Sequence, residues 1–156
     1  VLGLLAASVG IGAVLAAPVL SAWDARLPRG VMVRWALLAY ALAVLGFGAA
    51  PTWPLGLVAL LLVGAGFLVV IASTNTAIQM IVADEMRGRV MSVRVMGFTL
   101  AFPLGSLAQG ALADVIGAQL TVVVFGGCLF AAAAVLASFP GALAQLDAVD
   151  DTPDRG

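Results

Sequence analysis

The arginines that precede the tail of this chain lie in two short segments, which alternate with segments that carry no basic residue. Residues 26–34 and 87–94 hold all six of them, around the first and third interruptions of a nearly continuous apolar sequence. The second interruption, residues 51–53, and the fourth, residues 114–119, contain neither Lys nor Arg. Because Arg and Lys in short loops resist translocation, they stay on the cytoplasmic side of a membrane. The alternation therefore predicts a protein that crosses the bilayer repeatedly.

The composition supports this class and excludes others. The chain has 156 residues, of which 63% are hydrophobic and 10% charged, whereas a soluble domain is about 45–50% apolar and about a quarter charged. A net charge of −1 offers no basic face to nucleic acid. His is absent and Cys128 is the only cysteine, so we expect no metal site and no cofactor. An enzyme is not expected either, since no Ser or Cys has a basic partner nearby.

Five segments reach the roughly 20 apolar residues that a helix needs to cross the hydrocarbon. They are residues 1–23, 31–50, 54–83, 90–113 and 118–139. The period-2 alternation of a membrane β-barrel is missing from them. We therefore predict an all-α membrane protein of five transmembrane helices, with residues 1–146 as one helical bundle. Residues 147–156, rich in Asp, are expected to form a disordered cytoplasmic tail.

The arginine pattern also predicts an orientation. With both arginine segments in the cytoplasm, the N-terminal end lies outside and the C-terminus inside a plasma membrane. Trp23, Trp35 and Trp53 fall at the expected interfaces, where an indole ring is favoured. The chain lacks an initiator Met and has an odd number of spans, so we expect a piece of a longer protein. A valine-coded start is the alternative.

Glycines recur in pairs within the expected spans, at positions 10 and 12, 46 and 48, 64 and 66, and 126 and 127. In lipid, helices associate largely through close backbone approach at small residues. The pairs therefore predict a compact bundle with several tight helix–helix contacts. The alternative is that some of them form hinges or sliding surfaces.

Polar side chains inside two expected spans are candidates for a solute cavity. Ser73, Asn75 and Gln79 lie in the third span, with Asn75 and Gln79 four residues apart and hence on one face. Thr99 and Ser106 lie seven residues apart in the fourth span. An unpaired amide in hydrocarbon is costly, so these side chains should line a cavity or bond to another helix. No charged residue stands near the middle of a span, where an ion-coupling carboxylate would be expected.

Residues 74–92 include Asp84-Glu85-Met86-Arg87-Gly88-Arg89-Val90. This run resembles the loop between the tenth and eleventh helices of the major facilitator superfamily, in the branch of bacterial macrolide and siderophore exporters. Residues 103–105 and 110–114 fit the eleventh helix of that branch, and residues 10–13 with 24–29 are similar to the eighth helix and the loop after it. The resemblance implies that the five spans form most of a C-terminal six-helix bundle, helices eight to twelve.

The same resemblance implies a function. It suggests part of a secondary transporter that exports small amphipathic or apolar compounds by alternating access, with an N-terminal half as its missing partner and no activity alone. Loop charges then become candidates for ion pairs at a cytoplasmic gate: Asp24, Arg26, Arg29, Asp84, Glu85, Arg87 and Arg89. Plain topology anchors are the alternative, because exposed pairs are weak. The alternative function is a small membrane interaction protein that packs through its glycine-rich helices.

Overall fold

The computed structural model describes residues 2–24 and 29–139, apart from the side chains of residues 2, 19, 22–24 and 29. Five helices make up this part of the chain: α1 (Leu2–Asp24), α2 (Arg29–Gly48), α3 (Trp53–Ile81), α4 (Asp84–Ile116) and α5 (Ala118–Ser138). No strand occurs among the described residues. The expected all-α class is confirmed. The tail at residues 147–156 lies outside the described residues.

Four of the helices, α2 to α5, are long and apolar enough to cross a membrane. In α1 the apolar stretch with described side chains, Gly3–Pro18, is shorter than the 18 residues required of a membrane span. Such stretches form helices because hydrocarbon offers no partner to a backbone N–H or C=O, so each segment must satisfy its own.

Helix α4 extends beyond the expected fourth span at both ends. It begins at Asp84, so that the segment around Arg87 and Arg89 is helical, and only Val82 and Ala83 separate it from α3. Asp84 and Glu85 occupy its first turn, where carboxylates favour the partial positive charge of a helix N-terminus. At the other end a single residue, Gly117, with φ +88°, separates α4 from α5.

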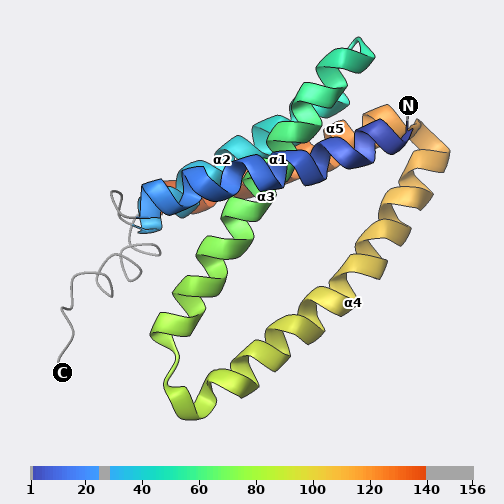
Figure 1. Cartoon of the computed structure of the whole chain (residues 1–156). Coiled ribbons are helices and arrows are strands. Elements are labelled where there is room, and N and C mark those ends of the chain that lie inside the picture. The colour runs from blue at the N-terminus through green and yellow to red at the C-terminus, as the bar shows by residue number, and fades with distance from the viewer. Residues whose placement is uncertain (1, 25–28, 140–156) are drawn as a thin grey trace.

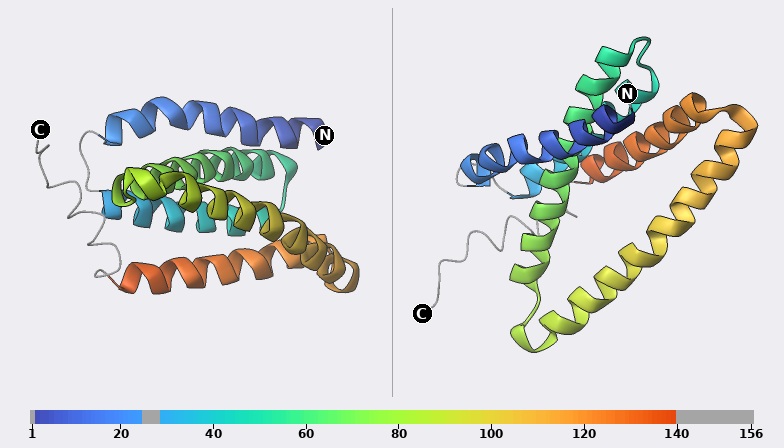
Figure 2. Two further views of the ribbon diagram at one scale, coloured as in Figure 1. Left: turned by 90° about the horizontal axis from the view of Figure 1, so that it is seen from below. Right: turned by 45° about the vertical axis from the view of Figure 1, so that its right-hand side comes forward.

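Helices α1, α3, α2 and α5 pack side by side in that spatial order, with α3 crossing obliquely between α1 and α2 (Figures 1 and 2). Glycine permits the α1–α3 contact at two places. A Cβ added to Gly12 would lie 2.0 Å from the carbonyl oxygen of Leu61, and one on Gly64 would lie 2.0 Å from that of Val9. The glycine pairs predicted close packing, and the α1–α3 crossing confirms it.

The contact between α2 and α5 is built in a similar way but is less tight. A Cβ on Gly48 would lie 2.9 Å from a methyl group of Val123, and one on Gly126 would lie 3.2 Å from Leu45. Here the nearest atoms belong to side chains, although the backbone nitrogen of Val123 also lies 3.1 Å from a Cβ on Gly48. Only one glycine of each of these pairs meets the partner helix, because Gly46 and Gly127 have no atom within 4 Å of an added Cβ.

Helix α4 stands apart from this packed group. None of its residues is buried along its 33 positions. It adjoins α3 where it begins and α5 where it ends, and between those ends it runs away from the other helices (Figure 1). The described structure is therefore a packed four-helix group with one helix held only at its ends.

Candidate functional site

The polar residues expected in the third span are distributed around α3 and have different partners. Asn75 is half-buried, and its side-chain oxygen accepts a hydrogen bond from the Arg94 guanidinium of α4. The Gln79 side chain is exposed, while its backbone carbonyl accepts a hydrogen bond of 3.1 Å from Arg87 Nη2. The Oγ of Ser73 is buried and has no hydrogen-bond partner among the described residues. Asn75 and the end of α3 thus face α4, through two of its arginines.

These two arginines lie near the connection of the α3–α4 hairpin, and each donates a hydrogen bond to α3. The last carbonyls of an α-helix lack partners within the helix, and cations near that end are favoured by the helix dipole. Arg87 satisfies one of these carbonyls by donating a hydrogen bond to that of Gln79, and it also places a positive charge at the end of α3. Arg94 lies seven residues further along, on the same face of α4, and makes the second contact.

Thr99 and Ser106 lie on the part of α4 that has left α3, and both are exposed. Ser106 Oγ donates to the carbonyl of Pro103 in its own helix at 2.9 Å, a common way for a serine to satisfy itself inside a span. The structure therefore does not gather the five predicted cavity residues at one place. Their role in lining a solute cavity stays a prediction, and it applies to α3 and α4 packed against a further part of the transporter.

Among the predicted gate charges, Asp84 and Arg87 form an ion pair of 2.6 Å. The two residues are three apart on α4, and both side chains are largely exposed to solvent. An exposed pair of this kind is worth about 0–1 kcal/mol. Glu85 and Arg89 are exposed. The Asp84–Arg87 pair stabilises the start of α4 and does not connect α4 to another helix.

Three of the gate charges belong to the part of the chain that the structure does not describe. Arg26 lies outside the described residues, and so do the side chains of Asp24 and Arg29. The predicted ion pairs of the first arginine segment therefore stay predictions.

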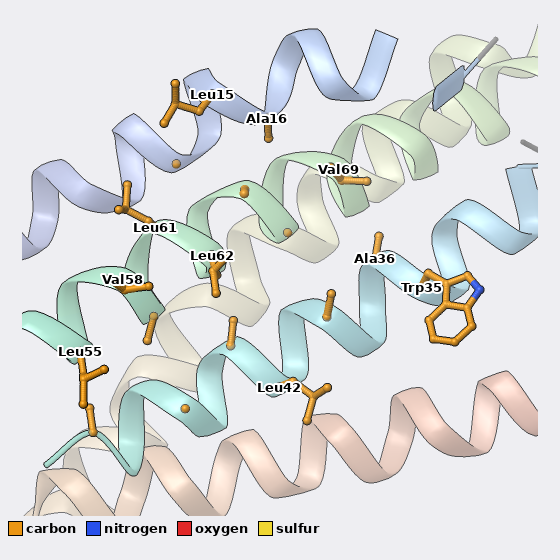
Figure 3. Close-up of a pocket in the computed structure, with 18 of the residues that line it drawn as sticks. Leu15, Ala16, Trp35, Ala36, Leu42, Leu55, Val58, Leu61, Leu62 and Val69 are labelled. Atoms are coloured by element: carbon orange, nitrogen blue, oxygen red, sulfur yellow. The ribbon is translucent and has the colours of Figure 1, made fainter. Parts of the chain in front are cut away.

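A groove that the sequence did not reveal runs along α1, α2 and α3, with a volume of about 1030 Å³ (Figure 3). Its walls are Ala, Gly, Leu and Val, with Met32 and Pro51, and the indole of Trp35 stands at one end (Figure 3). None of the predicted cavity residues lines it. Its walls are almost entirely hydrocarbon and carry no charge; among its lining side chains, the indole N–H of Trp35 is the one strong hydrogen-bond donor.

The residues of the groove carry no signal in the sequence because alanine and leucine recur throughout the chain. The Arg94–Asn75 contact was missed for another reason. Arg94 counted as one of the topology arginines, and its nearest polar partner is 19 residues away in the sequence. Only the short α3–α4 connection brings the two together.

Comparison with protein families gives one match, to a family described as a transmembrane secretion effector, over residues 1–155. Neither the curated proteins nor the solved structures include a match to the chain.

Proposed function

Because this chain belongs to the transmembrane secretion effector family of the major facilitator superfamily, we propose that it forms helices eight to twelve of a secondary active transporter. The proposed cargo is a small amphipathic or apolar compound, moved outward by alternating access. In such transporters the solute binds near the bilayer midplane between two helical halves, which rock against each other. On this proposal the chain supplies most of one half.

The observation that carries the proposal is the unpacked state of α4. Gly97, Gly105 and Gly110 lie on this helix, and a Cβ added to any of them would meet nothing within 4 Å. Small residues in a membrane helix allow close approach of another helix, as they do between α1 and α3. Helix α4 therefore has the small residues of a packed helix but no neighbour along its middle among the described residues, which fits a helix that contacts an N-terminal half.

The polar residues of α3 and α4 agree with this arrangement. Thr99 and Ser106 are uncharged and lie on the helix that would face the other half, and Asn75 and Gln79 lie on α3 where it adjoins α4. A wall of hydroxyls and amides among apolar side chains suits a solute that is mostly apolar and carries a few polar groups.

Reconstitution tests the proposal. Liposomes that contain the chain alone should show no flux of a neutral, a cationic or an anionic amphipathic dye above empty liposomes. Liposomes that hold the chain together with the spans encoded upstream of it, about seven in a superfamily transporter built of two six-helix halves, should transport at least one dye. Flux from the chain alone would contradict the proposal, as would the absence of further spans upstream.

The proposed orientation in the plasma membrane places the N-terminal end outside and the C-terminus in the cytoplasm. Topology reporters fused after Arg29 and after Thr52 should then give opposite readouts, cytoplasmic for the first and external for the second. Identical readouts would mean that the arginine segments do not follow the positive-inside rule.

The alternative, a membrane interaction protein that binds through its glycine-rich helices, has less support. Gly12, Gly48, Gly64 and Gly126 already pack against helices of the same chain. The glycines of α4 are free to bind a separate protein, and co-purification of the chain with an unrelated membrane protein, in place of the upstream spans, would favour this alternative.

A further inference from the structure

Arg94 lies deeper along its helix than a topology arginine needs to lie. It follows Asp84 by ten residues, about 15 Å along the axis at 1.5 Å per residue. Helix α4, with 33 residues, is about 50 Å long and exceeds the roughly 30 Å of hydrocarbon by about 20 Å. If this excess is shared between its ends, the hydrocarbon begins about 10 Å after Asp84. Arg94 then stands on the membrane side of that boundary, beyond Arg87 and Arg89.

The guanidinium of Arg94 is only partly satisfied by the protein. It has five N–H donors, and within residues 2–24 and 29–139 its one hydrogen bond goes to the Asn75 side-chain oxygen. Among the side chains that the structure describes, no carboxylate forms an ion pair with Arg94. Arg87 differs in this respect, since it both pairs with Asp84 and donates to the Gln79 carbonyl.

Asn75 orients the Arg94 guanidinium without neutralising it. An amide oxygen accepts a hydrogen bond but carries no net charge, so the positive charge of a half-buried guanidinium stays available. A charge near hydrocarbon is costly unless it is paired or hydrated. Beyond this contact α3 and α4 diverge (Figure 1), and no residue that the structure describes accepts a hydrogen bond from the remaining donors. A planar, bidentate oxyanion is the ligand that such a guanidinium matches best.

We propose that Arg94, held in place by Asn75, binds the anionic group of the transported solute, and that the solute is an organic anion with an apolar body. This inference rests on the proposed function and narrows its substrate class from apolar compounds in general to amphipathic carboxylates. The carboxylate contacts Arg94 at the cytoplasmic end of α3 and α4. The apolar body lies against the membrane-embedded part of α4, where Phe98 and Phe102 are more than half exposed.

Binding to the full chain in phosphatidylcholine nanodiscs tests the proposal without a transport assay. The probe pair is dansyl-labelled undecanoic acid and its methyl ester, which differ only in the charged group. The acid should bind at least about tenfold more tightly than the ester, because hydrogen bonds to charged groups exceed neutral ones by that amount or more. Equal binding of acid and ester would overturn the proposal.

Four variants locate the effect. Arg94→Gln should reduce the preference for the acid to about twofold or less, and Asn75→Asp should do the same because its own carboxylate pairs with Arg94. Asn75→Leu leaves the charge of Arg94 in place but removes the contact that orients it, so the preference should fall to a value between those of the unmodified chain and Arg94→Gln. The control Arg34→Gln removes an arginine of α2 that is exposed, whereas Arg94 is half-buried, and that forms no hydrogen bond or ion pair among the described residues. It should bind both probes as the unmodified chain does.

Three outcomes would contradict the proposal. Loss of the preference in Arg34→Gln would assign it to general surface charge. An unchanged preference in both Arg94→Gln and Asn75→Asp would place the anion elsewhere. A preference that disappears in nanodiscs containing phosphatidylglycerol would assign the site to a lipid headgroup and not to a solute. This binding test is independent of transport. If the complete transporter binds the acid but shows no flux, the proposed transport function is wrong while the proposed anion site at Arg94 stands.

Discussion

The α1–α3 crossing and helix α4 show how differently glycine acts at two places in one chain. At the crossing, Gly12 and Gly64 each face a backbone carbonyl of the other helix, so closely that a methyl group has no room. On α4, Gly97, Gly105 and Gly110 face no atom within 4 Å. The residue type is the same, and the apolar setting is similar. The difference is the presence of a neighbouring helix.

The comparison teaches that a small residue in a membrane helix allows close packing but does not by itself bring another helix into contact. Association in lipid depends on packing because the surrounding chains are as apolar as the helix surface. Where another helix is within reach, as at α1 and α3, the glycine lets the backbones meet. Where none is present, the glycine leaves a shallow surface open for a partner.

The largest effect is expected at the crossing. In Gly12→Ala the new methyl group would lie 2.0 Å from the Leu61 carbonyl oxygen, and a backbone atom cannot move aside without moving its helix. We expect the free energy of unfolding to fall by more than about 3 kcal/mol, above the usual range for overpacking. Denaturation of the chain in mixed micelles, followed by circular dichroism, measures it.

The control for this substitution is Gly10→Ala, two residues earlier on α1, where an added Cβ meets nothing within 4 Å. There the change in unfolding free energy should be about 1 kcal/mol or less, and in the stabilising direction because alanine favours a helix over glycine. Similar losses in both variants would show that α1 and α3 do not cross as described.

A smaller effect is expected where α4 joins α5. Gly117 has φ +88° and ψ 152°, a conformation that residues with a Cβ rarely adopt. Gly117→Ala should therefore lower the unfolding free energy by about 1–3 kcal/mol, measured in the same micelles. Gly127→Ala, in the regular part of α5 and without neighbours within 4 Å, is the control. A neutral Gly117→Ala would mean that the α4–α5 connection adopts another backbone conformation.

The smallest effect is expected on α4 itself. Gly97→Ala adds a methyl group to open space, so the unfolding free energy of the chain alone should change by less than about 1 kcal/mol. In the chain assembled with its upstream spans, the same variant should weaken the assembly if α4 packs there. This is measured by the fraction of the two parts that co-purifies. If Gly97→Ala lowered the unfolding free energy of the chain alone as much as Gly12→Ala does, α4 would be packed as tightly as the α1–α3 crossing.

Much of the fold follows from local properties of the sequence. The five helices lie on the five apolar segments because each such segment must satisfy its own backbone in hydrocarbon, and that requirement needs no knowledge of neighbours. The ends were less predictable. The sequence pattern predicts a fourth span that begins at residue 90, yet α4 begins at Asp84 and includes Arg87 and Arg89, because Asp84 and Glu85 stabilise an earlier helix start.

The candidate site was less accessible to sequence reasoning. The sequence marks Asn75 as a polar residue that needs a partner, but it suggests only a topological role for its partner, Arg94. The apolar groove was not anticipated at all. The Arg94–Asn75 contact and the groove both arise where separate helices meet. The sequence gives the identity of each residue there but not which residue of another helix lies beside it.

The sequence by itself determined that this protein is a set of apolar helices and which residues on them are small, polar or charged. Hydropathy and helix length are properties of single segments, and the bilayer acts on each segment separately. Only the tertiary structure decided that Gly12 and not Gly10 meets α3, that Arg94 reaches Asn75, and that α4 stays unpacked. Those outcomes depend on how the helices cross, and crossing is settled by surfaces that lie far apart along the chain.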